Sequence, residues 1–164
     1  MQENFRQFLD RLRDAKELID LKQPIDIRHI ATLVDQSDKA LLFHNVVGYD
    51  MPVVSGIIRT RERAIMGMGA KTYGEIEVKL KKAIDNPIPP IMVNTAPAYD
   101  VIATGDDIDL FKLPIPMSSI YDGGPMITAG VVIAKDPEFG INSGVYRMIV
   151  DNLEIFEAAM LAEH

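Results

Sequence analysis

Hydrophobic positions in the first part of the chain recur with helical or strand spacing. They predict an amphipathic helix over residues 5–15 and a short strand over residues 18–21. Asp26 is placed to cap a second helix, over residues 27–36. The positions expected to face inward are Phe5, Phe8, Leu9, Leu12, Ala15, Ile30, Leu33 and Val34.

The next stretch continues this alternation of strands and helices. Residues 40–47 and 52–58 favour strands. Thr60 can cap the helix that follows, and Thr72 begins a Thr-x-x-Glu capping box for another. That second helix must end before Pro87, because proline cannot continue it. The order of elements predicts an α/β domain.

Beyond the prolines the pattern becomes rich in strands. A short strand is expected over residues 91–93, and two more over residues 127–134 and 145–150, joined by a hairpin loop at 136–140. Residues 152–163 read as a closing helix. The change in pattern near residues 97–112 predicts two domains, an α/β domain over 1–100 and a β-rich segment with a terminal helix over 101–164.

Charge and composition exclude several classes of function. The net charge of -7 gives no electrostatic reason to bind nucleic acid. The chain has no cysteine, which excludes disulfides, zinc–thiolate sites and thiol nucleophiles. No secretory signal is visible, and no apolar run approaches the roughly 20 residues of a membrane-spanning helix. We therefore expect a cytoplasmic protein that binds neither membranes nor nucleic acid.

Familiar catalytic motifs are missing from the sequence. It has no G-x-S-x-G, H-E-x-x-H, P-loop or G-x-G-x-x-G pattern. His29, His44 and His164 are not paired at metal-ligand spacing. Structural or surface positions account for these histidines.

The most informative polar group follows the predicted hairpin loop. Asn142 offers a neutral oxygen ligand, Ser143 and Gly144 offer backbone amides, and Arg147 offers a guanidinium, which together suit a phosphate with its metal ion. The alternative is a plain hairpin with a surface arginine. Asn142 and Arg147 are five residues apart, so a regular strand would point them to opposite faces. If both contact one cofactor, the chain is expected to turn or bulge near Ser143 and Gly144.

Glycines earlier in the segment also suggest close approaches. Gly123 and Gly124 lie in a polar turn and permit a positive φ or a ligand close to the backbone. Gly130, inside a predicted strand, indicates a bulge or a close ligand.

Taken together, these motifs resemble the UbiD family of decarboxylases. The family pattern D-G-G-P-x-I-T-A-G, then K-D-P, then N-x-G-x-Y-R is matched by Asp122-Gly123-Gly124-Pro125-Met126-Ile127-Thr128-Ala129-Gly130, by Lys135-Asp136-Pro137, and by Asn142-Ser143-Gly144-Val145-Tyr146-Arg147. The likeness runs over residues 4–148. It implies that the second domain is part of a flavin-reductase-like split β-barrel.

The resemblance also implies a cofactor and a site. The cofactor would be prenylated FMN with Mn²⁺ and K⁺, and the substrate a small carboxylic acid. Asn142 matches the family's metal-ligand asparagine, and Asn152 falls where some relatives carry a second ligand. The segment from Asn142 to Arg147 (Asn142, Ser143, Gly144, Val145, Tyr146, Arg147) would contact the cofactor. Arg147 would also act in catalysis, since a guanidinium can bind a carboxylate and stabilise moving charge.

Family members run to several hundred residues, and their later metal ligand and catalytic acids have no counterpart here. We therefore expect a decarboxylase component or truncated form that self-associates or joins a larger subunit. The alternatives are a non-catalytic cofactor-binding or assembly subunit, and an unrelated flavin-binding split barrel.

Overall fold

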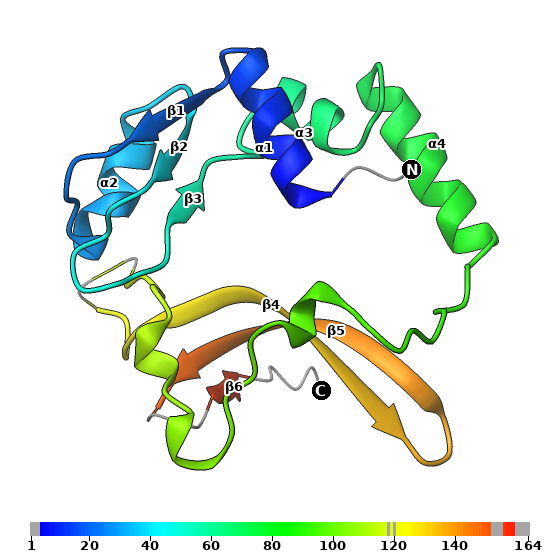
Figure 1. The fold of residues 1–164 in the computed structure, drawn as a ribbon. Coiled ribbons are helices and arrows are strands. Elements are labelled where there is room, and N and C mark those ends of the chain that lie inside the picture. Colours follow the sequence, from blue (N-terminus) through cyan, green and yellow to red (C-terminus); the bar gives the residue numbers. More distant parts are fainter. Residues whose placement is uncertain (1–3, 118, 120, 152–155, 160–164) are drawn as a thin grey trace. The chain divides into compact units, whose positions relative to one another are not determined.

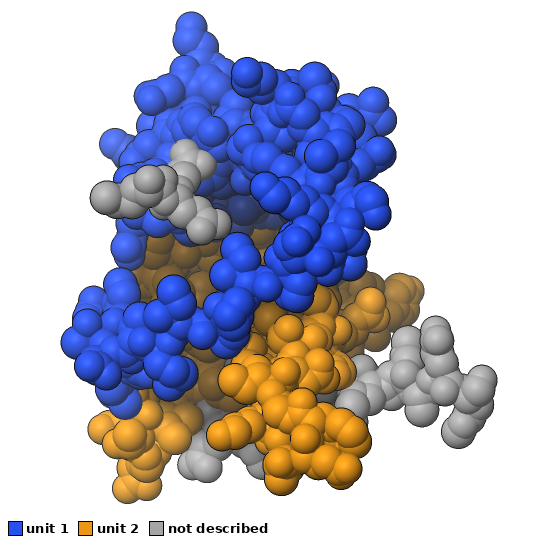
Figure 2. All heavy atoms as spheres, turned by 90° about the vertical axis from the view of Figure 1, so that its right-hand side faces the viewer, with its two compact units in different colours: residues 1–22, 34–43, 54–102 blue, residues 23–33, 44–53, 103–164 orange. Residues whose placement is uncertain are grey.

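The computed structural model describes residues 4–117, 119, 121–151 and 156–159. The chain divides into two compact units, coloured separately in Figure 2. Unit 1 comprises Met1–Lys22, Val34–Phe43 and Val54–Ile102, and unit 2 comprises Gln23–Leu33, His44–Val53 and Ala103–His164.

Unit 1 begins with helix α1 (Phe5–Asp14), which packs against strand β1 (Leu18–Leu21) (Figure 1). Asn4 and Gln7 form a reciprocal capping box at the start of α1, with donor–acceptor distances of 2.9 and 3.0 Å. Phe8 and Leu12 are buried on the inner face of this helix, whereas Phe5 and Ala15, which were expected to face inward, are exposed. The predictions of a helix over 5–15 and a strand over 18–21 are confirmed.

The sheet of the N-terminal part has the order β1-β2-β3. Strand β2 (Ala40–Phe43) pairs in parallel with β1, and β3 (Val53–Ser55) lies on its other side. A core cluster forms where α1 meets β1 and β2: Phe8, Leu12, Leu18 and Ala40 are buried, with Leu9, Leu42, Val54, Ile57 and Met66 packed around them. Burial of these apolar groups is the main favourable term that holds α1 on the sheet.

Polar side chains begin the helices as the sequence predicts. Asp26 accepts a hydrogen bond at the start of a 3-10 turn, η1 (Ile27–His29), which continues into α2 (Ile30–Asp35). Thr60 caps α3 (Arg61–Gly67).

Thr72 caps α4 (Tyr73–Asp85). The capping box here is altered, because Glu75 accepts from the backbone N–H of Lys71 at 2.7 Å. The start of α4 is therefore fixed by both side chains of the Thr-x-x-Glu motif.

An arginine lies fully buried in unit 1. The guanidinium Nη1 of Arg63 donates to Glu17 at 2.9 Å and to the carbonyl of Asp38 at 2.7 Å. Lys39 donates to the other oxygen of Glu17 at 2.8 Å. The hydrogen bonds from Lys39 and then from Arg63 hold the pKa of Glu17 below its usual value of 4.5. The carboxylate of Glu17, just before β1, therefore binds both Lys39, just before β2, and Arg63 in α3.

Unit 2 carries the longest strands. Three 3-10 turns, η2 (Pro97–Tyr99), η3 (Gly105–Asp107) and η4 (Leu110–Lys112), lead toward them, of which η2 still lies in unit 1. Strands β4 (Met126–Asp136) and β5 (Gly140–Val150) form an antiparallel hairpin (Figure 1).

The hairpin loop is stabilised locally. Asp136 accepts hydrogen bonds from the backbone N–H groups of Glu138 and Phe139, both at 2.8 Å, and these bonds lower the pKa of its carboxyl. Gly140 adopts a φ of +82°, which favours glycine. The predicted strands and hairpin are confirmed, and both strands are longer than expected.

Two predicted elements are wrong. Residues 91–93 form no strand; their hydrophobic side chains are exposed, and no partner strand pairs with them in the described part of the chain. Within the predicted helix over 152–163, Phe156–Ala159 form strand β6, which pairs antiparallel with β5. Pairing with the edge of β5 supplies backbone hydrogen bonds that outweigh the helical spacing. Residues 152–155 and 160–163 lie outside the described residues.

The helices that the structure describes include none with the length and apolar character needed to span a membrane.

Candidate functional site

Strand β5 carries the six residues predicted to contact a cofactor. Its pairing with β4 is regular from Gly140 to Tyr146, with Asn142 opposite Ala134 and Val145 opposite Val131. Regular pairing makes successive side chains alternate between the two faces. The six residues therefore divide into two sets of three: Ser143, Val145 and Arg147 on one face, and Asn142, Gly144 and Tyr146 on the other.

The expected turn or bulge at Ser143 and Gly144 is absent, so that prediction is wrong. The irregularity lies in the partner strand, between Ile127 and Gly130. The bulge expected beside Gly130 is thus confirmed. Gly144 pairs with Val132 in an unbroken ladder of β4 and β5, so the backbone does not bend at this glycine.

The face that bears Arg147 is apolar and open. Val145 is 68% exposed, its cross-strand partner Val131 is 67% exposed, and Ile133 next to them is 71% exposed. Arg147 is exposed and has no hydrogen-bond or ion-pair partner among the described residues. An apolar surface beside an unpaired guanidinium suits a flat ring system with an anionic group.

The opposite face is more closely packed. Gly144 and Tyr146 are both half-buried, and the ring of Tyr146 lies across Gly144. Asn142 is exposed on this face nearer the hairpin loop. Its carboxamide oxygen is a neutral ligand of the type that hard cations accept.

The glycines of the polar turn before β4 were expected to permit a positive φ, and the structure does not show one there. Neither Gly123 nor Gly124 has one. A Cβ on Gly124 would lie 3.5 Å from Cγ2 of Ile149, which is ordinary contact. Asp122 accepts from the backbone N–H of Ser119 at 2.9 Å and so stabilises the turn.

Metal ligands are sparse in the described part of the chain. No group of three or more His, Asp or Glu side chains is placed there to hold a metal ion. Asn152 lies outside the described residues. Asn142 is therefore one candidate ligand, and a complete coordination shell needs further groups.

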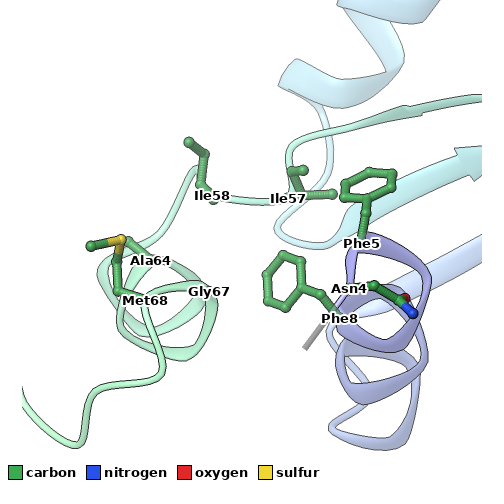
Figure 3. Close-up of a pocket in the computed structure, with 8 residues that line it drawn as sticks. All are labelled: Asn4, Phe5, Phe8, Ile57, Ile58, Ala64, Gly67 and Met68. Atoms are coloured by element: carbon green, nitrogen blue, oxygen red, sulfur yellow. The ribbon is translucent and has the colours of Figure 1, made fainter. Parts of the chain in front are cut away.

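A separate apolar pocket of about 400 Å³ lies within unit 1 (Figure 3). Its lining residues are Asn4, Phe5, Phe8, Ile57, Ile58, Ala64, Gly67 and Met68. The single polar member, Asn4, is engaged in the capping box of α1. No charged side chain lines this pocket, so it does not suit a carboxylate or a phosphate.

Sequence reasoning missed two parts of the β4–β5 site. The sequence did not predict that Val131 lies opposite Val145. It also did not predict that the bulge at Thr128 and Ala129 lies opposite Arg147. Strand alternation could have put Val145 and Arg147 on one face, but the pairing with β4 depends on register, which one strand alone does not define.

Comparison with known proteins identifies the class. The family model of the 3-octaprenyl-4-hydroxybenzoate carboxy-lyase N-terminal domain (UbiD_N) matches residues 9–81. The family model of the Rift-related domain of the same lyase (UbiD) matches residues 91–164. The chain belongs to the UbiD family, as the sequence motifs indicated.

Its relatives are longer enzymes. The anhydromevalonate phosphate decarboxylase of Methanothermobacter thermautotrophicus is 30% identical over 146 residues, which cover 88% of this chain and 33% of the relative. The UbiD-class enzyme HmfF from Pelotomaculum thermopropionicum, solved with FMN, has a TM-score of 0.87 at 35% identity. The match covers 97% of this chain and 37% of HmfF.

An evolved dimeric form of HmfF, solved with prFMN, has a TM-score of 0.86 at 35% identity over 97% of this chain and 38% of that one. This chain thus spans about a third of the length of the curated relatives it matches. The mixed α/β fold is confirmed.

Proposed function

We propose that this chain is a cytoplasmic component of a UbiD-type non-oxidative, reversible decarboxylase of aromatic or α,β-unsaturated acids. It would bind prenylated FMN and act together with further polypeptide. The observation that carries this proposal is that Arg147, which has no hydrogen-bond or ion-pair partner among the described residues, shares one face of the β4–β5 hairpin with the exposed side chains of Val131 and Val145.

Arg147 has the chemistry that decarboxylation requires. Its guanidinium can donate two parallel hydrogen bonds to a substrate carboxylate. The same fixed positive charge stabilises negative charge that shifts as CO₂ leaves. Val131 and Val145 offer a flat apolar surface that orients an aromatic ring and excludes water from it. When bound, prenylated FMN supplies the electron sink for the reaction.

The metal end of the cofactor is assigned to Asn142, with Asn152 as a second ligand. Mn²⁺ and K⁺ are the proposed ions. Asn142 and Arg147 lie on opposite faces of β5, so Asn142 would hold the metal end of the cofactor from one face and Arg147 would bind the substrate carboxylate from the other.

A non-catalytic cofactor-binding or assembly subunit is the second candidate. It is favoured by the length of the chain, which spans about a third of the curated relatives that it matches. Family membership removes the third alternative, an unrelated split barrel. The split-barrel topology itself, self-association and a larger partner subunit belong to the proposal.

Native mass spectrometry tests the cofactor assignment. Protein made with prenylated FMN and Mn²⁺ available is expected to carry one flavin and one metal ion. Arg147→Ala is expected to lower flavin occupancy, and Asn142→Ala to lower metal and flavin occupancy together. Lys135→Ala removes an exposed cation from the same hairpin and serves as the control. Unchanged occupancy in both site variants would exclude this assignment.

Catalysis needs its own measurement. Release of CO₂ from an aromatic acid, by this chain alone or with an added partner subunit, separates the decarboxylase from the non-catalytic subunit. Flavin binding without turnover in any combination favours the second candidate.

A further inference from the structure

The irregularity in β4 lies directly across from Arg147. Ile127 pairs with Met148, and Gly130 pairs with Tyr146. Two residues of β4, Thr128 and Ala129, therefore stand opposite one residue of β5. This is a β-bulge with one extra residue in β4.

The bulge changes which side chains share a face. In a regular strand Ile127 and Gly130, three residues apart, would point to opposite faces. Here Ile127 and Gly130 lie on the same face as Met148. A Cβ on Gly130 would lie 2.1 Å from Cε of Met148 and 3.3 Å from Cγ2 of Ile127. The bare backbone at Gly130 accommodates the two side chains that the bulge brings together.

On its other side, β5 is regular. Arg147 pairs with Ala159 of β6, and Met148 pairs with Ala158, with no register shift between them. Any local change of direction at Arg147 therefore comes from β4. A bulge increases the local twist and redirects the residue opposite it.

We propose that the bulge at Thr128–Ala129 is a positioning element that sets the direction of the Arg147 side chain. The two small residues leave the guanidinium clear of cross-strand contacts, and the added twist aims it at the bound anion. This inference rests on the proposed function for the role of Arg147. The direction of the Arg147 side chain, however, depends only on the hairpin.

Deletion of Ala129 is the direct test. It would place Thr128 opposite Arg147 and leave every other cross-strand pair unchanged, so the hairpin can still form. With FMN and Mn²⁺ as the probe, flavin fluorescence is expected to show binding weakened by about tenfold, the size of a lost hydrogen bond to a charged group.

A double-mutant cycle separates positioning from general damage. Arg147→Ala is expected to weaken FMN binding about as much as the deletion, and the two together no more than either alone, because both remove the same contact. Additive losses would overturn the proposal, as would undiminished binding by the deletion variant. Thermal unfolding of each variant establishes that it folds.

A second measurement needs no cofactor. Because the chain has no cysteine, Arg147→Cys can carry a single nitroxide spin label. Deleting Ala129 is expected to change the label's electron paramagnetic resonance line shape, while a label at Ser143→Cys, in the regular part of β5, keeps its line shape.

Identical spectra at position 147 with and without Ala129 would refute the positioning role. If the wild-type protein fails to bind FMN, the proposed function is rejected, and the spin-label comparison still decides whether the bulge directs this side chain.

Discussion

The ring of Tyr146 lies across the backbone of Gly144, so that a Cβ on Gly144 would come within 2.6 Å of Cε2 and 3.1 Å of Cζ of the tyrosine. The two residues share one face of β5. Glycine at 144 thus leaves the space that an aromatic ring occupies, and the strand remains regular there.

Gly144→Ala is expected to lower the free energy of unfolding by about 1–3 kcal/mol, because the rigid ring must move. Gly130→Ala should cost less, since the atom nearest to its new Cβ is the flexible end of Met148. Urea unfolding compares the two variants. Combining Gly144→Ala with Tyr146→Ala should remove most of the cost; an equal cost in both backgrounds contradicts the contact.

Gly140→Ala and Gly74→Ala are expected to have opposite effects on stability. Neither new methyl group meets another atom within 4 Å. Gly140 has a φ of +82°, so alanine there costs about 1–2 kcal/mol. Gly74 lies in α4, where alanine gains roughly 0.5–1 kcal/mol. Chemical denaturation measures both, and a stabilising Gly140→Ala would contradict the assigned turn.

Glu17→Gln is expected to destabilise unit 1 by about 2–3 kcal/mol. The change removes the carboxylate that balances the fully buried Arg63, whose Nε and Nη2 already have no hydrogen-bond partner among the described residues. Loss of one partner from a buried pair costs about 3–5 kcal/mol, and the partial exposure of Glu17 reduces that figure. Glu62→Gln, an exposed carboxyl in α3, is the control in urea unfolding; equal effects of the two changes would argue against the buried pair.

The same carboxyl predicts a pH dependence. Hydrogen bonds from Lys39 and Arg63 lower the pKa of Glu17 in the folded state, so its contribution to stability is present above the unfolded value of 4.5. That contribution is lost as the pH falls below 4.5 and through the lower folded pKa. Unfolding of the wild type and of Glu17→Gln at pH 7, 5, 4 and 3 should show their difference shrinking with acid. A constant difference would exclude this linkage.

Features that depend on a few neighbouring residues followed from the sequence alone. Asp26, Thr60 and Thr72 were identified as helix caps because each bonds to a backbone N–H two or three residues away. The hairpin loop and the bulge beside Gly130 were predicted for a similar reason. The UbiD motifs lie in this local class too, since they are read directly along the chain.

The tertiary structure decided everything that depends on which segments meet. Phe156–Ala159 form a strand because an edge of β5 is available to them. Arg63 is buried because Glu17, distant in sequence, lies beside it. The opposite faces of Asn142 and Arg147 follow from the unbroken ladder with β4. Register, burial and strand pairing are set by contacts between distant residues, and the local pattern of one segment does not contain them.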